Sequence, residues 1–474
     1  MLKKIALHWQ ILIALILAVV YGLLFPTRYS VNNETIKLLE QKKVSIEIIT
    51  AAKKIIHENK ESFITQDEFQ RELEKLIDPD LLKKNKPVIM EAAYDNPYVN
   101  GVSWMGDIFL RALKMLIIPL ILSSLISGVT NIESSSNLGR LSFKTFGYYI
   151  STSILAILTG LVLVNLIQPG VGADLSFSQA VHGLVDKQKS FTEILVDIVP
   201  TNIFKAFSEG DMLSIIFFAI LFGFFITLVN EKSKTFLKDF FNSVFDVMMK
   251  LTLFVIKFTP LGIFGIVAKV VADQDDLGNL VSRMSLYMGT VLLALSIHYF
   301  ITLPLIAKFI GGIKPFKHMK NMSAALLTAF STSSSGATLP LTINCVEENS
   351  GVSNKISSFT LPLGATINMD GTALYECVAA IFIAQAYGVH LGFFEQVIIV
   401  ITALLASIGA AAIPMAGLVM MTVILTAVHL PLEGVGLILA VDRILDMFRT
   451  STNVWSDSCG AAIIARSEGE ELKV

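Results

Sequence analysis

Charged residues are scarce in this chain: Lys, Arg, Asp and Glu make up 16% of its 474 residues, whereas hydrophobic residues make up 53%. The mean hydropathy is correspondingly high, at +0.66. A soluble globular domain usually devotes about a quarter of its residues to charge, so this composition argues against one. It indicates a protein that lies in a lipid bilayer.

Cysteine and histidine are also few, and their placement excludes several kinds of site. Cys345, Cys377 and Cys459 stand far apart in or beside apolar segments, and the seven histidines are equally scattered. Neither a disulfide framework nor a zinc motif has such spacing. The net charge of -2 offers no basic surface, so no nucleic-acid partner is predicted.

Long apolar runs recur along the whole chain. They cover residues 5–25, 108–129, 148–167, 213–229, 244–271, 287–310, 374–386 and 397–430. Several exceed the roughly 20 residues that cross a bilayer core about 30 Å thick. Because no small-residue cleavage site follows the first run, we expect a retained helix, with Lys3 and Lys4 on the cytoplasmic side.

One strongly polar block, residues 28–101, interrupts this pattern. Its acids and bases nearly balance, so we expect a solvated helical insertion on the side opposite the N-terminus. A partner-binding or regulatory module is the alternative. Beyond it, helices are predicted at about 104–131, 141–168, 192–229 (broken), 236–272 and 281–311.

The last third of the chain contains two similar interruptions. An apolar stretch at about 314–349 is broken by "FSTSSSGATLPLT" and followed by a helix with "GATINMDGTALYE". Another, at about 394–430, is broken by "SIGAAAIPMAG" and followed by "DRILDMFRTSTNVWSD". Interrupted apolar segments in corresponding halves indicate the midplane site of a secondary transporter. Open backbone at that depth must line a cavity or contact protein.

The last polar helix carries one stripe at spacings of three or four residues. Its members are Asp442, Asp446, Arg449, Thr450, Asn453 and Asp457. A charge at the bilayer centre costs about 3 kcal/mol, which favours a functional site over an internal salt-bridge ladder. Arg449 can bind a carboxylate with two donors and Asp446 can accept an ammonium group, as an acidic amino acid requires. Asp442 and Arg443 either support this grip or line a hydrated path.

The "NMDG" sequence predicts a partly unwound helix, because Pro362, Gly364 and Gly371 lie near Asn368 and Asp370. Free carbonyls and a carboxylate suit a hard monovalent cation. A kink with a capping aspartate is the alternative.

Glu376 and a serine-rich turn are the remaining polar candidates. A buried carboxyl group retains its proton, so Glu376 is either a proton carrier or a neutral hydrogen-bonding group. Ser333, Ser334, Ser335 and Gly336 stand where one half-helix ends and another begins, so they either cradle an anion or form a plain turn. An intramembrane serine hydrolase is a remote alternative, because these serines have no histidine or lysine in a partner motif.

These motifs together resemble the dicarboxylate/amino acid:cation symporter family, which includes the excitatory amino acid transporters and prokaryotic glutamate and aspartate symporters. "TSSSGATLP", "GATINMDGTALYE", "ASIGAAAIPMAG" and "DRILDMFRTSTNVWSD" occur in family order, and the resemblance covers the chain except residues 28–101. It implies an all-α polytopic membrane protein with eight transmembrane helices, two re-entrant helical hairpins and inverted repeats. Such a protein is an elevator-type transporter and a homotrimer, not an enzyme.

The resemblance also implies a trimer scaffold and a moving transport domain, in a multi-pass protein of the cell (inner) membrane that contacts lipid. The predicted segments are the first helix (1–27, scaffold), the extracytoplasmic insertion (28–101), the second helix (102–135, scaffold), the third helix (136–171, transport), the fourth and fifth helices (172–275, scaffold) and the remaining helices with both hairpins (276–474, transport).

Site residues are implied motif by motif. The substrate site contains Ser333, Ser335, Thr372, Ile413, Gly417, Asp446, Arg449, Thr450 and Asn453. Three sodium sites are implied. The first contains Gly364, Asn368, Asn453 and Asp457, and the second contains Thr366, Ser407, Ile408 and Ala410. The third contains Tyr149, Thr152, Ser153, Asn368 and Asp370. Glu376 matches the acidic residue of the proton-carrying members.

The implied activity is uptake of L-glutamate or L-aspartate with about three Na+ ions, and with H+ through Glu376, because Arg449 matches the arginine of acidic amino acid carriers. Ser333 and Met447 replace a further arginine of the family, so K+ countertransport is left open. The alternatives are a C4-dicarboxylate or a neutral amino acid symporter of the same fold. Asp446 argues against the dicarboxylate because it would repel a second carboxylate.

Overall fold

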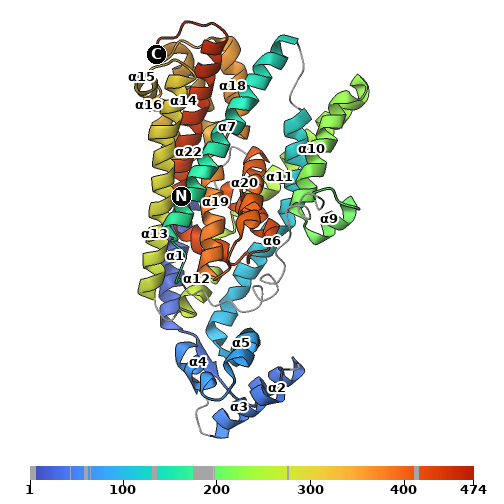
Figure 1. Ribbon diagram of the computed structural model, residues 1–474, viewed down its shortest axis with the longest axis vertical. Coiled ribbons are helices and arrows are strands. Elements are labelled where there is room, and N and C mark those ends of the chain that lie inside the picture. The colour runs from blue at the N-terminus through green and yellow to red at the C-terminus, as the bar shows by residue number, and fades with distance from the viewer. Residues whose placement is uncertain are drawn as a thin grey trace, which may run out of the picture.

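Helices make up most of this protein, whose computed structural model describes residues 7–42, 44–57, 62–63, 66–130, 136–173, 196, 198–274, 277–409 and 416–474. They form a long bundle with a small domain below one end (Figure 1). The prediction of a mostly helical chain with several apolar helices is confirmed.

The bundle contains the following elements. In chain order they are α1 (Leu7–Leu24), α6 (Pro97–Thr130), α7 (Ser136–Ile167), α9 (Ile203–Glu209), α10 (Met212–Leu228), α11 (Glu231–Ile256), α12 (Thr259–Ala272), α13 (Leu277–Ile297), the π-helical turn η1 (His298–Thr302), α14 (Leu303–Phe309), α15 (Pro315–Asn321), α16 (Ser323–Thr332), α17 (Ser335–Asn344), a second π-helical turn η2 (Cys345–Asn349), α18 (Asn354–Ile367), α19 (Asp370–Ala386), α20 (Phe393–Gly409), α21 (Ala416–Ala427) and α22 (Gly434–Ser467).

Within the described residues, four helical spans are long and apolar enough to cross a bilayer. They are Pro97–Thr130, Arg140–Ile167, Gly278–Phe309 and Asn354–Ala386. The bent pair α11 and α12 makes a fifth when it is counted as one span. Shorter apolar helices lie in α1, α10, α16 and α20.

The helix predicted at 236–272 is not continuous, and that prediction was wrong. α11 and α12 meet at an angle of 52°. Pro260 lies in the first turn of α12, where proline is tolerated because the N–H there has no helical partner, whereas it cannot continue the hydrogen bonding of α11. α12 then packs along α1 and α6.

The helices pack in two sets. α1, α6, α10, α11 and α12 contact one another, as do α7, α13 and α16 to α22, and the sets meet where α20 and α21 contact α6 and where α12 contacts α22. Backbones approach closely in the first set, because a Cβ on Gly265 would lie 2.7 Å from the Gly106 nitrogen. Small residues permit such close packing between helices in a bilayer.

Large apolar side chains remain exposed on the outer helices of the first set. On α10 and α11 they include Phe222, Phe224, Phe225, Phe236 and Phe240. A soluble monomer rarely leaves so large an apolar surface in contact with water. These helices therefore present a surface suited to lipid or to another protein.

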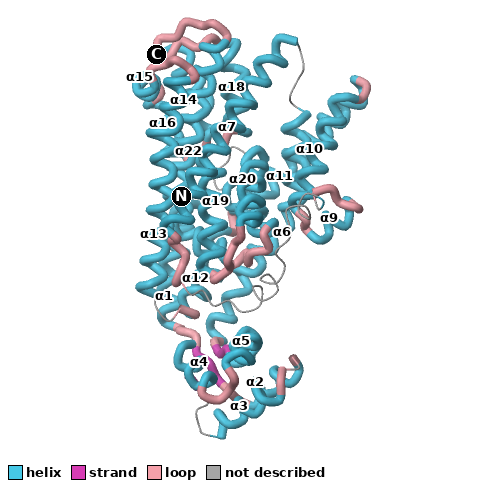
Figure 2. The backbone as a smooth tube through the Cα atoms, viewed as in Figure 1, coloured by secondary structure: helices cyan, strands magenta, loops and turns pink. Residues whose placement is uncertain are grey.

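The small domain between α1 and α6 has its own apolar core. Its elements are α2 (Asn33–Gln41), α3 (Ile46–His57), α4 (Gln66–Glu74), α5 (Pro79–Ala93) and an antiparallel sheet ordered β2 (Ser62–Phe63), β1 (Arg28–Ser30), β3 (Tyr94–Asp95). Figure 2 shows the strands in magenta beside α4. Helices were expected here, but the sheet was missed, because strands of two or three residues are too short to show a periodic pattern.

A buried junction holds this domain to the bundle. Thr27 donates its backbone N–H to the Ala272 carbonyl oxygen (2.8 Å) and its hydroxyl to Asp273. Asn96 donates to the Phe25 carbonyl oxygen (2.9 Å) and to the Thr27 hydroxyl (3.1 Å). Burial raises the pKa of Asp273, just past α12, to about 6.

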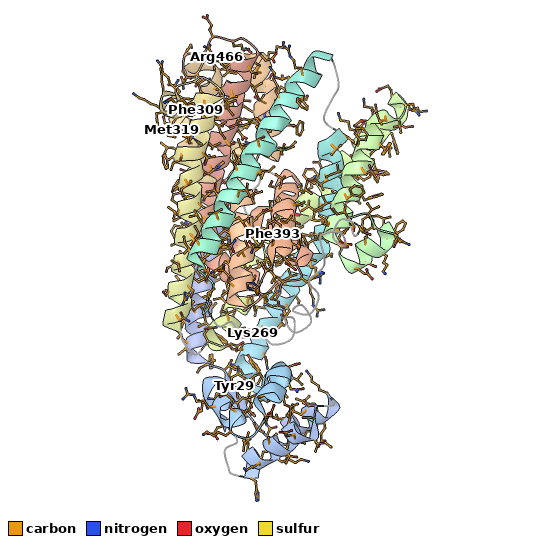
Figure 3. The ribbon with its side chains drawn as sticks, in the orientation of Figure 1. Tyr29, Lys269, Phe309, Met319, Phe393 and Arg466 are labelled. Atoms are coloured by element: carbon orange, nitrogen blue, oxygen red, sulfur yellow. The ribbon has the colours of Figure 1, made fainter. Side chains whose placement is uncertain are left out.

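The two ends of the bundle are fixed differently. Figure 3 shows Lys269 at the end that adjoins the small domain and, at the opposite end, Phe309, Met319 and Arg466. There, Glu468 pairs with Lys144 (2.6 Å) and with Arg140, both on α7. These two contacts lower the pKa of Glu468, and they tie the end of α22 to the start of α7.

Candidate ligand and cation site

The site is built around a helix that breaks inside the bundle. α18 ends at Ile367 and α19 begins at Asp370, while Asn368 (φ -92°, ψ 85°) and Met369 (φ -115°, ψ 57°) between them are not helical. Every residue in the most apolar window of this span is buried. The partial unwinding predicted from "NMDG" is therefore confirmed.

The serine-rich turn lies beside this break. α16 ends at Ser333, whose φ of 52° is left-handed, and the Ser334 side chain accepts from the Ala337 N–H (3.2 Å) at the start of α17. Ser335 donates its hydroxyl to the Ala365 carbonyl oxygen (3.1 Å) on α18. The Ser333 hydroxyl is buried and has no hydrogen-bond partner within the described residues. A free donor therefore lies at the junction of two helices.

Arg449 is a buried charge of the site, at 1% exposed. Its Nη2 lies 2.7 Å from Asp446 Oδ1 and 3.1 Å from Asp442 Oδ1. Its guanidinium carbon lies 3.8 Å from the centre of the Tyr375 ring, a cation–π contact. The two aspartates and the ring thus fix the guanidinium on one side.

The other side of this cluster lacks hydrogen-bond partners. Nε and Nη1 of Arg449 and Oδ2 of Asp446 are buried and make no hydrogen bond to any described residue. Buried donors and acceptors left unpaired are costly. Guanidinium N–H groups and a carboxylate oxygen that make no hydrogen bond to a described residue are complementary to a ligand that carries both a carboxylate and an ammonium group.

Asp442 and Arg443, whose role was left open between two alternatives, both contact the pair of Arg449 and Asp446. Asp442 pairs with the guanidinium, and Arg443 Nη1 lies 3.8 Å from Asp446 Oδ2. Tyr375 was not predicted from the sequence as a residue of the site. Its only signal is its position in "TALY", one helical turn after Thr372.

Asn453 links the arginine helix to the broken helix. It accepts from the Gly371 N–H (2.8 Å) and donates to the Thr372 hydroxyl (3.2 Å). α21 covers the same spot, because a Cβ on Gly417 would lie 3.0 Å from Arg449 Nη1 and 3.5 Å from Thr372 Cγ2. Three helices therefore converge on the guanidinium.

The structure thus places most of the predicted substrate residues in one region. It brings together Thr372, Gly417, Asp446, Arg449 and Asn453. Ser333 and Ser335 lie at the turn beside α18, and Thr450 is buried on α22. Ile413 lies outside the described residues.

The third predicted sodium site is a cluster of buried oxygen atoms between α7 and the break. Ser153 donates to Asp370 Oδ1 at 2.7 Å, and Thr152 Oγ1 lies 3.3 Å from Asp370 Oδ1 and 3.4 Å from Asn368 Oδ1. The Tyr149 hydroxyl donates to the Thr360 carbonyl oxygen (2.8 Å). Hard cations are bound by oxygen atoms of this kind, so the donor set fits sodium.

The first predicted sodium site is equally compact. Asn368 donates Nδ2 to Asp457 Oδ1 at 2.8 Å. A Cβ on Gly364 would lie 2.5 Å from Asp457 Oδ1 and 2.7 Å from the Tyr149 hydroxyl. Only glycine lets the α18 backbone approach the carboxylate this closely.

The described residues of the second predicted sodium site make no hydrogen bonds to one another through their side chains. Thr366 donates to the Leu363 carbonyl oxygen (3.0 Å) and Ser407 to that of Leu404 (2.8 Å), each within its own helix. α18 does contact α20. Ala410 and the side chain of Ile408 lie outside what the structure describes.

Glu376 lies on α19, next to Tyr375. It is fully buried, and neither carboxyl oxygen has a hydrogen-bond partner in the described part of the chain. An ionised carboxylate without a partner is too costly in such surroundings. The surroundings therefore favour the neutral, protonated form.

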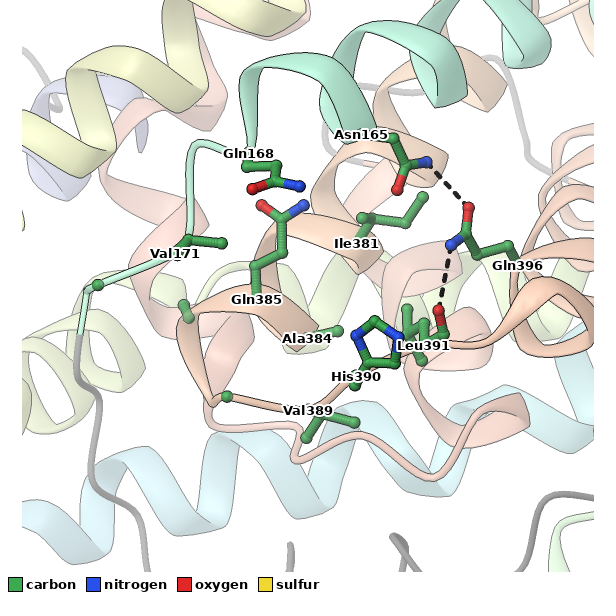
Figure 4. A pocket seen from close by; sticks show the side chains of 13 residues that line it. Asn165, Gln168, Val171, Ile381, Ala384, Gln385, Val389, His390, Leu391 and Gln396 are labelled. Atoms are coloured by element: carbon green, nitrogen blue, oxygen red, sulfur yellow. Dashed lines mark hydrogen bonds between the residues drawn. The ribbon is translucent and has the colours of Figure 1, made fainter.

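A separate cavity of about 310 Å³ lies where α7 and α19 end and α20 begins (Figure 4). Asn165 Nδ2 donates to Gln396 Oε1 (2.9 Å), and Gln396 Nε2 donates to the Leu391 carbonyl oxygen (3.2 Å). Gln385 and His390 also line it. None of the predicted site residues does, and its amides connect α20 to α7.

Fold and site together define a class of protein. Charged and amide side chains converge on broken helices inside an apolar, bilayer-sized bundle, and several of their polar atoms have no partner among the described residues. Such intramembrane charge at interrupted helices is typical of secondary transporters.

The chain belongs to the sodium:dicarboxylate symporter family, whose model matches residues 7–467. It is similar to human excitatory amino acid transporter 3, with 38% identity over 419 residues, 78% of this chain and 79% of the relative. It is also similar to an excitatory amino acid transporter of Caenorhabditis elegans (38% over 410 residues, 77% and 80%) and to human excitatory amino acid transporter 2 (37% over 426 residues, 78% and 74%). The family predicted from the motifs is confirmed, and the chain is a transporter rather than an enzyme.

Proposed function

We propose that this protein is a sodium-coupled symporter that takes up L-glutamate, L-aspartate or both across the cell membrane. One observation carries the choice of substrate: Nε and Nη1 of Arg449 lie in the same buried cluster as Oδ2 of Asp446, and none of these atoms makes a hydrogen bond to a described residue. The unpaired N–H groups of the guanidinium bind the side-chain carboxylate of the substrate, and Asp446 binds its ammonium group. The relatives' names, excitatory amino acid transporters, agree with this choice.

The α-carboxylate of the substrate is bound by neutral donors. Ser333 offers a free hydroxyl, and the first N–H groups of α17, a helix of 10 residues, follow directly. Exposed N–H groups at a helix start favour an anion. Thr450 and Asn453 complete the grip from α22.

Sodium ions are cosubstrates in this proposal and occupy the three sites predicted from the motifs. Asn453 belongs to both the substrate site and the first sodium site, and Asn368 to two sodium sites, so each bound ion orders groups that the next ligand needs. Coupling requires such differential affinity between states. Each net positive charge that crosses 100 mV contributes about 2.3 kcal/mol, so carrying more Na+ than substrate charge supports steep accumulation. Glu376 is the proposed proton carrier.

The moving parts are proposed from the two helix sets. α1, α6 and α10 to α12 form the scaffold of a homotrimer, whose exposed phenylalanines on α10 and α11 meet lipid or neighbouring subunits. α7, α13 and α16 to α22 form the transport domain, with α16–α17 and α20–α21 as re-entrant hairpins among eight transmembrane helices. The second hairpin closes over the substrate as the gate. In support, Gly417 lies so close to the guanidinium that an added Cβ would be 3.0 Å from Arg449 Nη1.

Competition of radiolabelled L-aspartate uptake into proteoliposomes tests the substrate. We expect unlabelled aspartate and glutamate to inhibit, and succinate and serine not to. Arg449→Cys removes the fork and leaves Asp442 and Asp446 unpaired, so acidic uptake falls at least about 100-fold, as truncation of a buried charge pair costs roughly 3–5 kcal/mol. Arg466→Cys, at the exposed end of the same helix, is the control.

Each other outcome selects an alternative. Stronger inhibition by succinate than by aspartate supports a C4-dicarboxylate carrier and overturns the role of Asp446. Stronger inhibition by serine supports a neutral amino acid carrier. Acidic uptake that survives Arg449→Cys overturns the role of Arg449.

A further inference from the structure

The carboxylate of Asp370 has its two oxygens committed to different partners. Oδ1 faces α7, where it accepts from Ser153 (2.7 Å) and lies 3.3 Å from the Thr152 hydroxyl. Oδ2 accepts from Ser456 on α22 (2.7 Å) and contacts His298 Nε2 on η1 (3.0 Å). The carboxylate therefore cannot rotate without breaking contacts on both sides.

Ser456 makes a second hydrogen bond, which fixes the side chain of Asn368. Its hydroxyl accepts from Asn368 Nδ2 at 3.0 Å, and the same amide nitrogen donates to Asp457 Oδ1 at 2.8 Å. With both N–H groups of the amide turned toward α22, its Oδ1 faces the Thr152 hydroxyl, at 3.4 Å. An amide orientation is normally assigned from such a network. Ser456 thus sets the direction of both polar side chains at the break.

His298 reaches Asp370 from a distorted turn in a third helix. It is the first residue of η1, the π-helical turn inside the span Gly278–Phe309, and it is fully buried. A π-helical turn inside an α-helix is often found at a functional site. Because an ionised carboxylate only accepts hydrogen bonds, the Nε2 of His298 is the donor to Oδ2.

Neither residue belongs to the ligand set implied by the motifs, yet both contact it. We propose that Ser456 and His298 are positioning residues of the third sodium site. They hold Asp370 Oδ2 and the Asn368 amide so that Asp370 Oδ1 and Asn368 Oδ1 face Tyr149, Thr152 and Ser153 before the ion arrives. A site ordered in advance binds its ligand more tightly. The inference rests on the proposed function, because it takes this oxygen cluster as a sodium site.

Ser456→Ala tests the proposal, with Ser458→Ala as the matched control. Both serines are buried on α22, but the Ser458 hydroxyl bonds to the Trp455 carbonyl oxygen of its own helix (2.9 Å). We expect Ser456→Ala to raise the sodium concentration for half-maximal aspartate uptake at least about five-fold, since a lost hydrogen bond to a charged group has an effect of that order. The maximal rate at saturating sodium stays within about two-fold, and Ser458→Ala changes neither quantity.

A second readout does not depend on transport. Thermal unfolding of the purified protein, in NaCl against choline chloride without amino acid, reports sodium binding directly. The stabilisation by sodium shrinks in Ser456→Ala and in His298→Leu. It is retained in part in His298→Gln, whose side chain can still donate to Asp370. Equal sodium responses of Ser456→Ala and Ser458→Ala in both assays would overturn the positioning role.

Asp370→Asn separates this inference from the proposed function. If sodium no longer stabilises Asp370→Asn, while Ser456→Ala and His298→Leu behave as wild type, the site stands and the positioning role is wrong. If Asp370→Asn keeps the full sodium response, the site is misplaced, and both proposals for it are overturned.

Discussion

At the scale of single residues, the site depends on how closely backbone and carboxylate can approach. Gly364 brings α18 to Asp457, and Gly371 brings α19 to Arg449, because a Cβ on Gly371 would lie 2.7 Å from the Arg449 carbonyl oxygen. Side chains at these positions would separate the helices that supply oxygen atoms. Because Gly364 and Gly371 have no side chain, the helices that supply the oxygen atoms of the site can approach one another closely.

Gly364→Ala should weaken sodium binding. The added methyl group would lie 2.5 Å from Asp457 Oδ1, and overpacking of this kind costs about 1–3 kcal/mol. We expect the sodium concentration for half-maximal uptake to rise about ten-fold or more, which corresponds to roughly 1.4 kcal/mol. Gly289→Ala on α13, where an added Cβ meets nothing within 4 Å, is the control. Equal sodium dependence in the two variants would contradict this role of Gly364.

The sequence predicted the charged residues of the site better than the residues that hold them. The spacing of Asp446, Arg449 and Asn453 marks one face of a helix, so it could be found without a structure. Tyr375 contacts Arg449 from α19, and His298 and Ser456 contact Asp370 from η1 and α22. No local pattern encodes such contacts. Their roles could be recognised only after folding.

At the scale of elements, the residues of the candidate site lie where helices break. The break between α18 and α19 was predicted, because proline, glycine and polar residues coincide there. The bend between α11 and α12 was missed, because Pro260 lies within the mostly apolar stretch 244–271 and gives only a weak local signal. Sequence patterns thus locate a break most reliably where polar residues accompany it.

The start of α20 is held to α7 by amides. Gln396→Leu removes the bonds to Asn165 and to the Leu391 carbonyl oxygen, each of which contributes about 1 kcal/mol. We expect faster hydrogen exchange in the first turns of α20 and a melting temperature a few degrees lower. Ser285→Ala, an exposed residue bonded only to the Val281 carbonyl oxygen of its own helix, should change neither. Unchanged exchange in α20 would refute this anchoring role.

At the scale of the whole molecule, the small domain and the bundle share one buried junction. Asp273 has a pKa of about 6 against an ordinary value of 3.8, so the folded protein binds more protons than the unfolded chain between these values. Its contribution to stability is therefore fully present below pH 3.8 and is lost as the pH rises through about 6. One pKa unit corresponds to about 1.4 kcal/mol, which bounds the effect at a few kcal/mol.

Asp273→Asn should remove this dependence, because the amide oxygen can still accept from the Thr27 hydroxyl without becoming charged. We expect the melting temperature of the wild type to fall relative to that of Asp273→Asn as the pH rises through about 6, the pKa of the folded carboxyl group. Asp107→Asn on α6 is a comparison whose exposed side chain lies outside the junction. A melting-temperature difference that stays constant across this pH range would contradict the predicted loss of stability.

Sodium-driven uptake of acidic amino acids is the central activity proposed for this protein. The most direct measurement is the accumulation of radiolabelled L-aspartate in proteoliposomes with NaCl outside and choline chloride inside, compared with equal NaCl on both sides. We predict a transient accumulation above the external concentration with the gradient, and none when sodium is equal or absent. Equal accumulation in external choline chloride would contradict sodium-coupled symport.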